Sequence, residues 1–437
     1  MGISLLRAVT VAAFGFSLLE PVLAISPAFN YGTDKVRGVN LGGWLVLEPW
    51  ITPSLFENTG ISTIVDEWTF CEYQDTDIAR ETLTKHWSTW ITESDFADIA
   101  SAGLNHVRIP IGYWAFNVTE HEPYIQGQVD YLRKALRWAA AHGLQVIVDL
   151  HGVPGSQNGF DNSGRRMSYP GWHSDHSNIV RSNDILYEMA RLFGGNASII
   201  EPLNELSPMF YSRRYYEFIG LRPAGFCGDD VLQVVKQYWE DSYDAIRSIP
   251  GTNAVVLIHD AFQDLSYWKD FMRREDNYDG VAMDTHIYQM FSGEEVARSD
   301  DEHIAAACQE GPSLSSFHLW TIVGEWTAAP TDCAKYLNGK SFDPVLCRGV
   351  GARYDGTYPN STWVGDCGCK TGSASSFSQE YKDFLRKYWE AQVITYQNWI
   401  HWTWKAESAD DWSYQAGLAG GWIPRNVTDL LYPTICG

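Results

Sequence analysis

Short runs of apolar residues alternate with longer amphipathic stretches along almost the whole chain. The longer stretches, such as VDYLRKALRWAAAHG and VLQVVKQYWEDSYDAIRSI, carry apolar residues at helical spacing. The short runs predict eight strands: Arg37–Leu41, His106–Ile111, Gln145–Leu150, Ser198–Leu203, Ala254–Ile258, Val281–Asp284, Trp320–Val323 and Trp399–Trp404. Near-continuous apolar strands separated by helices predict a parallel sheet covered by helices. Eight of them, with no linker between, predict an α/β chain folded as a single-domain (β/α)₈ TIM barrel.

Polar or aromatic residues stand at or just beyond the ends of nearly all these strands. They are Asn40, Arg108, His151, Asn204, Glu205, Asp260, His286, Tyr288, Glu325 and Trp402. Because the C-terminal ends of all the strands meet at one mouth of a barrel, we expect these side chains to share one pocket.

Two carboxylates in this set, Glu205 on the fourth strand and Glu325 on the seventh, would face each other across the mouth. Such a pair splits an acetal without metal or cofactor, since one group protonates the leaving oxygen while the other attacks the anomeric carbon or activates water. A separation of about 5–5.5 Å gives retention, and one of roughly 6.5–9.5 Å gives inversion. Arg108 is expected to hold Glu325 ionised, and His286 and Tyr288 to orient the nucleophile or the sugar.

Composition narrows the classes of partner. The 437 residues carry a formal net charge of -22, which argues against nucleic acid and anionic membranes as partners. The 19 Trp and 23 Tyr fit either a buried core or stacking on sugar rings. The eight cysteines lack the paired spacing of a zinc site, so no metal and no cofactor is predicted.

The first 24 residues, with Arg7, an apolar stretch and a small residue at the end, predict a secretory signal peptide cleaved after Ala24. Residues 25–437 would then form the catalytic domain of a secreted, extracellular protein, free or associated with a cell wall. Sequons at Asn117, Asn196, Asn360 and Asn426 fit a glycoprotein. In an exported chain the cysteines are expected to form disulfides.

Six motifs together resemble the fungal exo-β-1,3-glucanases of glycoside hydrolase family 5. They are GVNLGGWLVLEPWITPSLFE, NHVRIPIGYWAF, DLHGVPGSQNGFDNSG, DTHIYQMF, IVGEW and HWTWKAE, and their order and spacing carry the resemblance from about Arg37 to Cys436. It implies a (β/α)₈ barrel, a retaining mechanism, a β-1,3-glucan substrate and a monomer.

The resemblance also implies roles for individual residues. Glu205 matches the acid/base and Glu325 the nucleophile. The supporting shell around the reacting sugar would be Arg108, His151, Asn204, His286, Tyr288 and Trp402, and the residues that bind sugar hydroxyls would be Glu48, Asp161 and Asn162. Phe160 and Phe291 would grip the next glucose at the entrance. The cysteines would pair as Cys308–Cys436 and Cys333–Cys367, which leaves Cys71, Cys227, Cys347 and Cys369 unassigned.

One stretch departs from the family pattern, which has proline directly after the acid/base. Here Leu206 follows Glu205, and removal of residues 206–222 would join Glu205 to Pro223 and restore the pattern. We therefore interpret 206–222 as an insertion, either an unspliced short intron that was translated when the protein sequence was derived from the gene, or a real loop that adds a basic aromatic wall beside the acid.

The resulting hypothesis is a secreted retaining exo-β-1,3-glucanase that releases glucose from chain ends, with transglycosylation onto glucan acceptors. One alternative is another family 5 specificity: a β-1,6-glucanase, a β-glucosidase or a rutinosidase-like diglycosidase. The other is a glucan-binding barrel whose insertion has impaired catalysis.

Overall fold

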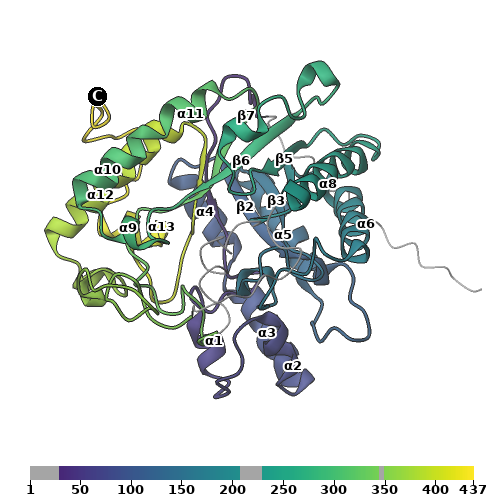
Figure 1. Ribbon diagram of the computed structural model, residues 1–437, viewed down its shortest axis with the longest axis horizontal. Helices are drawn as coiled ribbons and strands as arrows, with labels where there is room; N and C mark the ends of the chain where they lie inside the picture. Colours follow the sequence, from purple (N-terminus) through teal and green to yellow (C-terminus); the bar gives the residue numbers. More distant parts are fainter. Residues whose placement is uncertain (1–28, 207–228, 344–348) are drawn as a thin grey trace, which may run out of the picture.

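A closed barrel of eight parallel strands forms the centre of the computed structural model, which describes residues 29–206, 229–343 and 349–437 (Figure 1). The strands are β1 Arg37–Asn40, β2 His106–Gly112, β3 Gln145–Gly152, β4 Ile199–Glu201, β5 Val255–His259, β6 Val281–Ile287, β7 Trp320–Trp326 and β8 Trp399–His401. They are hydrogen-bonded in chain order, and β8 returns to pair with β1. The predicted (β/α)₈ fold is confirmed. The predicted signal peptide, and all of the predicted insertion except Leu206, lie outside the described residues.

Helices surround the barrel. They are α1 Pro53–Glu57, α2 Glu67–Glu72, α3 Thr76–Thr89, α4 Glu93–Ser101, α5 Gln128–Ala141, α6 His176–Phe193, α8 Asp229–Arg247, α9 Gly293–Val296, α10 Asp300–Gln309, α11 Gly311–Ser316, α12 Gln379–Tyr396 and α13 Tyr414–Gly420. Helices α10 and α12 lie side by side on one side of the barrel and α6 and α8 on the other (Figure 1). Their inner faces bury the main apolar core against the strands.

Polar residues mark where several of these helices begin. Asp66 accepts a hydrogen bond from the Thr69 backbone at the start of α2, and Ser299 and Glu302 cap each other's backbone at the start of α10. Such caps satisfy N–H groups that have no partner within the helix. The helix boundaries therefore follow from local sequence as well as from packing.

The interior of the barrel is filled in layers. Residues two apart on a strand face the same side, so each inward-facing set climbs the barrel in steps of two. The bottom layer is the apolar cluster Val36, Ile147, Ile199, Leu257, Ala282, Ile322 and Ile400. Two residues beyond Ile147 on β3 and Ala282 on β6 stand Asp149 and Asp284, so the middle layer is charged. Two residues further along the same strands, His151 and His286 lie at the mouth.

Five strands, β2, β3, β5, β6 and β7, end one to three residues later than the apolar runs predict, whereas β1, β4 and β8 end one to three residues earlier. In β3, β6 and β7 the extension arises because polar site residues continue the sheet pairing. The register shifts at two of these ends. Gly112 pairs with Gly152, so His151 is the extra residue of β3, and His286 pairs with Glu325, so Gly324 is the extra residue of β7. Such bulges turn the following side chain and are common beside active sites.

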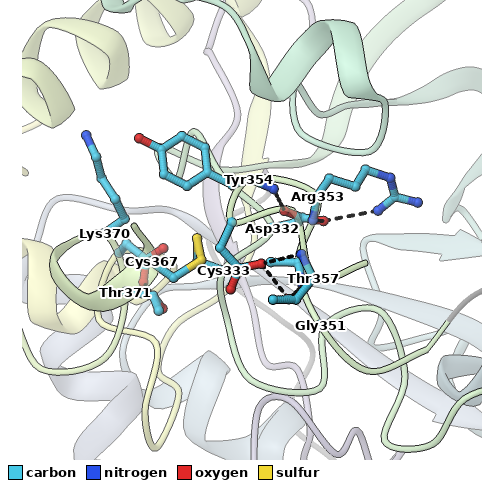
Figure 2. The surroundings of a disulfide bond; sticks show 12 residues. Asp332, Cys333, Gly351, Arg353, Tyr354, Thr357, Cys367, Lys370 and Thr371 are labelled. Atoms are coloured by element: carbon cyan, nitrogen blue, oxygen red, sulfur yellow. Dashed lines mark hydrogen bonds and ion pairs between the residues drawn. A yellow bond between two sulfur atoms is a disulfide. The ribbon is translucent and has the colours of Figure 1, made fainter. Parts of the chain in front are cut away.

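The two disulfides implied by the resemblance, Cys308–Cys436 and Cys333–Cys367, are present. The first ties the C-terminus to α10. The second lies in the connection between β7 and α12, where the neighbouring Asp332 accepts hydrogen bonds from Arg353 and from the Tyr354 backbone (Figure 2). Residues of this connection pack with Trp50, Trp402 and Trp412 in a cluster of their own at the mouth.

The remaining cysteines are only partly described. Within the described ranges, Cys71 is buried and Cys369 exposed, and neither forms a disulfide there. Cys227 and Cys347 lie outside those ranges. No helix in the described part of the chain has the length and apolarity needed to cross a bilayer.

Candidate active site

Glu325, the residue predicted as nucleophile, lies at the C-terminal end of β7 and has both carboxylate oxygens bound. Arg108 donates to Oε1 at 2.9 Å and the Tyr288 hydroxyl donates to Oε2 at 2.9 Å. Because both oxygens act as acceptors, these contacts hold an ionised carboxylate in one orientation. The predicted contact between Arg108 and Glu325 is therefore present.

Glu205, the predicted acid/base, follows β4 in a loop and has a backbone φ of 39°. This left-handed conformation is costly for a residue with a side chain, and such costs concentrate at functional sites. His286 Nδ1 lies 3.0 Å from Oε1, and the Asn162 amide donates to Oε2 at 3.1 Å.

Arg108 organises the charged layer beneath the two glutamates. Its guanidinium forms a bidentate pair with Glu201, at 2.7 and 2.9 Å, and lies 3.1 Å from Asp149. It also donates to the side-chain oxygens of Asn204, at 2.7 Å, and Asn40, at 3.0 Å. Burial disfavours its charge, but the carboxylates of Asp149 and Glu201 raise the pKa of Arg108 well above its usual value, so it stays a cation.

His151 and Trp402 form another wall of the mouth. Their rings stack with 5.7 Å between centroids and 8° between planes. Asp149 lies 2.6 Å from His151 Nδ1, and Asn204 lies between the His151 ring and Arg108. Trp402 follows β8 and is nearly buried.

One oxygen of Glu205 and one of Glu325 lie within 4.8 Å of each other, and a nitrogen of His286 lies within the same distance of both. The two predicted carboxylates therefore share one pocket with Arg108, His151, Asn204, His286, Tyr288 and Trp402.

The predicted sugar-binding residues lie around this centre. Glu48 is buried and accepts from Trp50 Nε1 at 3.1 Å. Burial, with the neighbouring charges of Asp161 and Glu325, raises the pKa of Glu48 well above its usual value. The Phe291 ring is 36% exposed and meets Tyr288 edge-on, 5.4 Å between centroids, while Phe160 begins the turn that carries Asp161 and Asn162. That Phe160 and Phe291 grip a sugar together stays a prediction.

Comparison with known proteins identifies the family to which the chain belongs. A family model described as cellulase (glycosyl hydrolase family 5) matches residues 59–330. The chain belongs to glycosyl hydrolase family 5. It is similar over its whole length to curated proteins named glucan 1,3-beta-glucosidase. One from Lachancea kluyveri is 40% identical with 100% of both chains covered, and one from Blumeria graminis is 42% identical with 98% of this chain and 95% of the relative covered.

Solved structures share the family's barrel. A rutinosidase from Aspergillus niger superposes with a TM-score of 0.65 at 21% sequence identity, over 91% of this chain and 99% of the other. At that identity the likeness concerns the fold alone.

The pKa values of the two glutamates shift in opposite directions at this family 5 site. Burial, reinforced by Glu205, raises the pKa of Glu325, although His286 and Arg108 oppose the shift. Burial would also raise the pKa of Glu205, but the hydrogen bond and charge of His286 hold it below its usual value. Arg108 lowers the pKa of Glu325 as expected, but burial is the larger effect and the net shift is upward.

Sequence reasoning missed three buried carboxylates below the glutamates: Asp149, Glu201 and Asp284. Each interrupts an apolar strand, in VIVDLH, SIIEPL and VAMDTH. The repeated Asp-x-His spacing was a usable signal, because it places an aspartate directly below an inward-facing histidine on β3 and on β6.

Two groups of side chains bring possible metal-ligand atoms within 4.8 Å of one another: Glu201 with Asp284 and His286, and Glu205 with His286 and Glu325. In both groups the His286 nitrogens face carboxylate oxygens at hydrogen-bond distance. A ring that donates on both sides has no lone pair for a metal, so the arrangement is that of an acid–base cluster.

Proposed function

We propose that this protein is a retaining exo-acting glucan 1,3-β-glucosidase that releases glucose from the ends of β-1,3-glucan chains. The carboxylate pair at the mouth of a family 5 barrel carries the proposal, together with the relatives of that name that match the chain over its full length. Secretion by cleavage after Ala24, action on cell-wall glucan, and a monomeric state belong to the same proposal.

In the proposed reaction, Glu325 attacks the anomeric carbon while Glu205 protonates the departing oxygen, which leaves a glucosyl ester on Glu325. Glu205 then takes a proton from water as the water displaces Glu325. Carboxylate oxygens less than 4.8 Å apart support retention, because an inverting pair must leave room for a water molecule between its carboxyl groups.

Hydrogen-bond donors hold Glu325, whose negative charge is lost when the glucosyl ester forms and returns when the ester breaks. Arg108 and Tyr288 hold the two oxygens of Glu325 so that one lone pair is available for attack. The flat faces of Trp402 and His151 offer a floor for the reacting sugar. Glu48, Asp161 and Asn162 are proposed to bind its hydroxyls, and Phe160 and Phe291 to flank the next sugar.

Product analysis on laminarin, pustulan and rutin tests the proposal. We expect glucose from laminarin, formed first as the β-anomer, and little product from the other two. Release of glucose from pustulan alone would assign a β-1,6-glucanase, and cleavage of rutin without glucose from laminarin would assign a diglycosidase. Binding of laminarin without release of glucose would assign an impaired glucan-binding barrel.

The status of residues 206–222 needs a separate measurement. The intact mass of the secreted, deglycosylated protein shows whether those residues and the first 24 are present. A mass that lacks both would establish signal cleavage and an intron that is removed in the cell, whereas a mass that includes 206–222 would establish a real loop beside Glu205.

A further inference from the structure

Burial would raise the pKa of Glu205, but the hydrogen bond and charge of His286 lower it, so a carboxylate is favoured before substrate binds. The Phe160 backbone donates to Asn158 Oδ1 at 2.9 Å, which directs the Asn158 amide nitrogen to Asn162 Oδ1 at 3.1 Å. The Asn162 amide nitrogen is therefore left to donate to Glu205 Oε2. With His286 at Oε1, both oxygens of Glu205 face donors, and the proton that a general acid needs must be held elsewhere.

His286 carries that proton. Its Nδ1 lies 3.0 Å from Glu205 Oε1 and 3.5 Å from Glu325 Oε2, and its Nε2 lies 3.3 Å from Asp284 Oδ2. A proton on each ring nitrogen satisfies all of these contacts when the three carboxyl groups are ionised, so the contacts match an imidazolium. The pKa agrees: burial works against the charge, but Glu325 and Asp284 raise the pKa of His286 well above its usual value.

Two neighbouring histidines lack such an arrangement. His259 Nδ1 accepts a hydrogen bond from the Ala261 backbone at 3.0 Å, so that nitrogen bears no proton. In His151, Nδ1 faces Asp149, but Nε2 faces the amide nitrogen of Asn204, whose oxygen is turned to Arg108. Of these three rings at the mouth, His286 alone has carboxylates on both sides.

Asp284 is fixed independently of the ring it contacts. Its Oδ1 accepts the backbone N–H of Gly324 at 2.8 Å, and it is fully buried. A Cβ at position 324 would lie 2.3 Å from both oxygens of Asp284, so only glycine leaves room for this carboxylate. Gly324 is also the extra residue of the β7 bulge that directly precedes Glu325.

Other charged and titratable groups face His286 from the adjoining strands. They are Glu201 below it on β4, His259 at the end of β5, Asp260 directly after it, Tyr288 beyond the end of β6, and the two glutamates. Each of these groups either belongs to a separate contact or is one of the reacting carboxylates. Asp284 remains as the carboxylate that contacts Nε2 of His286.

We infer that Asp284 is a positioning residue that keeps His286 doubly protonated and aimed at Glu205, so that His286 stores the proton that Glu205 delivers. The inference rests on the proposed function, because it assigns the source of the proton in that reaction. Gly324 is part of the same arrangement, because the absence of a side chain at this position leaves the space that the Asp284 carboxylate occupies.

The proton balance is complete within these groups. The Nδ1–H bond of His286 breaks as an O–H bond forms on Glu205, which leaves a neutral ring with its Nε2–H on Asp284. Glu205 passes the proton to the departing glycosidic oxygen as Glu325 bonds to the anomeric carbon. In the second step Glu205 takes a proton from the attacking water and returns one to Nδ1, while the bond to Glu325 breaks.

The Asp284→Asn variant tests this assignment. Its amide oxygen can still accept the Gly324 N–H, but its amide nitrogen faces Nε2 and forces the ring into the neutral form. We expect kcat/KM for laminari-oligosaccharides to fall at least about tenfold, because general acid catalysis contributes 10²–10⁴-fold. For an aryl β-glucoside whose leaving group needs no proton, we expect a change of less than about threefold.

The pH profile gives a second readout. The alkaline limb of kcat/KM on laminari-oligosaccharides should move down by about one pH unit or more in Asp284→Asn, because the proton store loses its anionic partner. Asp66→Asn is the matched control, since Asp66 is a buried aspartate whose partners are Thr69 and the Arg166 backbone, neither of them assigned to the site; we expect it to leave both the substrate ratio and the pH limbs unchanged.

Equal losses on both substrates, or unmoved pH limbs in a folded Asp284→Asn variant, would overturn the inference. If that variant does not fold, Gly324→Ala takes its place, because its Cβ displaces the same carboxylate and should give the same substrate dependence. Failure of the wild-type protein to release glucose from laminarin would instead refute the proposed function. A comparison of that aryl glucoside with phenyl β-glucoside, whose leaving group needs a proton, would then still test the role of Asp284.

Discussion

Glu205 and Glu325 differ in their partners, and this difference predicts how their glutamine variants fail. Glu325→Gln removes the nucleophile, so we expect loss of nearly all activity on every substrate. Glu205→Gln removes the acid, so we expect kcat/KM on laminari-oligosaccharides to fall by about 10²–10⁴ while an activated aryl glucoside is spared in the first step. Initial rates on the two substrates measure this, and thermal unfolding checks that both variants fold. Near-wild-type rates in either variant would contradict its assigned role.

The residues that sequence reasoning found and missed differ in position along their strands. Glu325, His286 and His151 stand where apolar runs stop, so they were recognisable as strand-end residues of a barrel. Glu201 lies within the predicted run Ser198–Leu203 and Asp284 at the end of the run Val281–Asp284, where a single charge looks like an interruption or the end of the apolar pattern. Their partners come from other strands, so their purpose depends on three-dimensional contacts that a linear pattern does not contain.

At the scale of elements, the number, order and type of the strands could be predicted, but their ends could not. The apolar run of β6 stops at Asp284, yet the strand continues to Ile287 because the polar residues keep their pairing with β7. The bulge at Gly324 could not be predicted either. The motif IVGEW alone does not show that Asp284 occupies the space where a side chain at position 324 would lie.

The two disulfides should differ in their effect on function. Replacing both Cys333 and Cys367 by serine opens a loop of 34 residues and should cost about 4 kcal/mol of unfolding free energy. Because this connection packs with Trp402 and Trp412 at the mouth, we also expect a higher KM for laminarin. Chemical denaturation and steady-state kinetics measure the two effects.

The Cys308/Cys436 double serine variant is the comparison. Its separation of 128 residues predicts a slightly larger stability loss, about 5 kcal/mol, but it joins α10 to the C-terminus and should leave KM unchanged. If KM rose equally in both variants, the effect would come from general loosening of the fold, and the specific link between the β7–α12 connection and the mouth would be refuted.

For the whole molecule, buried acids and buried histidines predict how stability depends on pH. Burial raises the pKa of Glu67 and Asp260 to about 7 and that of Asp411 to about 8. Because the folded-state pKa of each acid lies above its unfolded value, protonation of the acid stabilises the folded protein. This contribution is complete below about pH 4 and is lost as pH rises to the folded-state pKa. Each group contributes a slope of about 1.4 kcal/mol per pH unit.

Buried neutral histidines act in the opposite direction. Burial lowers the pKa of His86 to about 4 and of His106 and His401 to about 3, so stability rises with pH until about 6.5, where the unfolded histidines lose their protons. The two sets offset each other below about pH 6.5. We therefore expect the unfolding free energy to be nearly constant in mildly acidic solution and to fall between about pH 6.5 and 8.

Urea denaturation across that range measures this decline, and Asp411→Asn should make it shallower because the amide has no charge to bury. Asp264→Asn is the control: its hydrogen bonds to Ser266 lower the pKa of this exposed carboxyl, so it titrates below the range and should not alter the slope. A stability that stays constant from pH 6.5 to 8 would contradict the expected burial of protonated acids.

The pairing of β1 with β8 places a condition on when the protein can fold. Val36 donates its backbone N–H to the Asn398 side chain, 362 residues further along, and Arg37 is paired with Trp399. Until the ribosome has added that last strand, the first has no neighbour on one side and the apolar barrel interior stays open to water. Completion of the native state must therefore wait for nearly the whole chain to be synthesised, and premature termination before residue 399 would leave every earlier strand in a sheet with two unprotected edges.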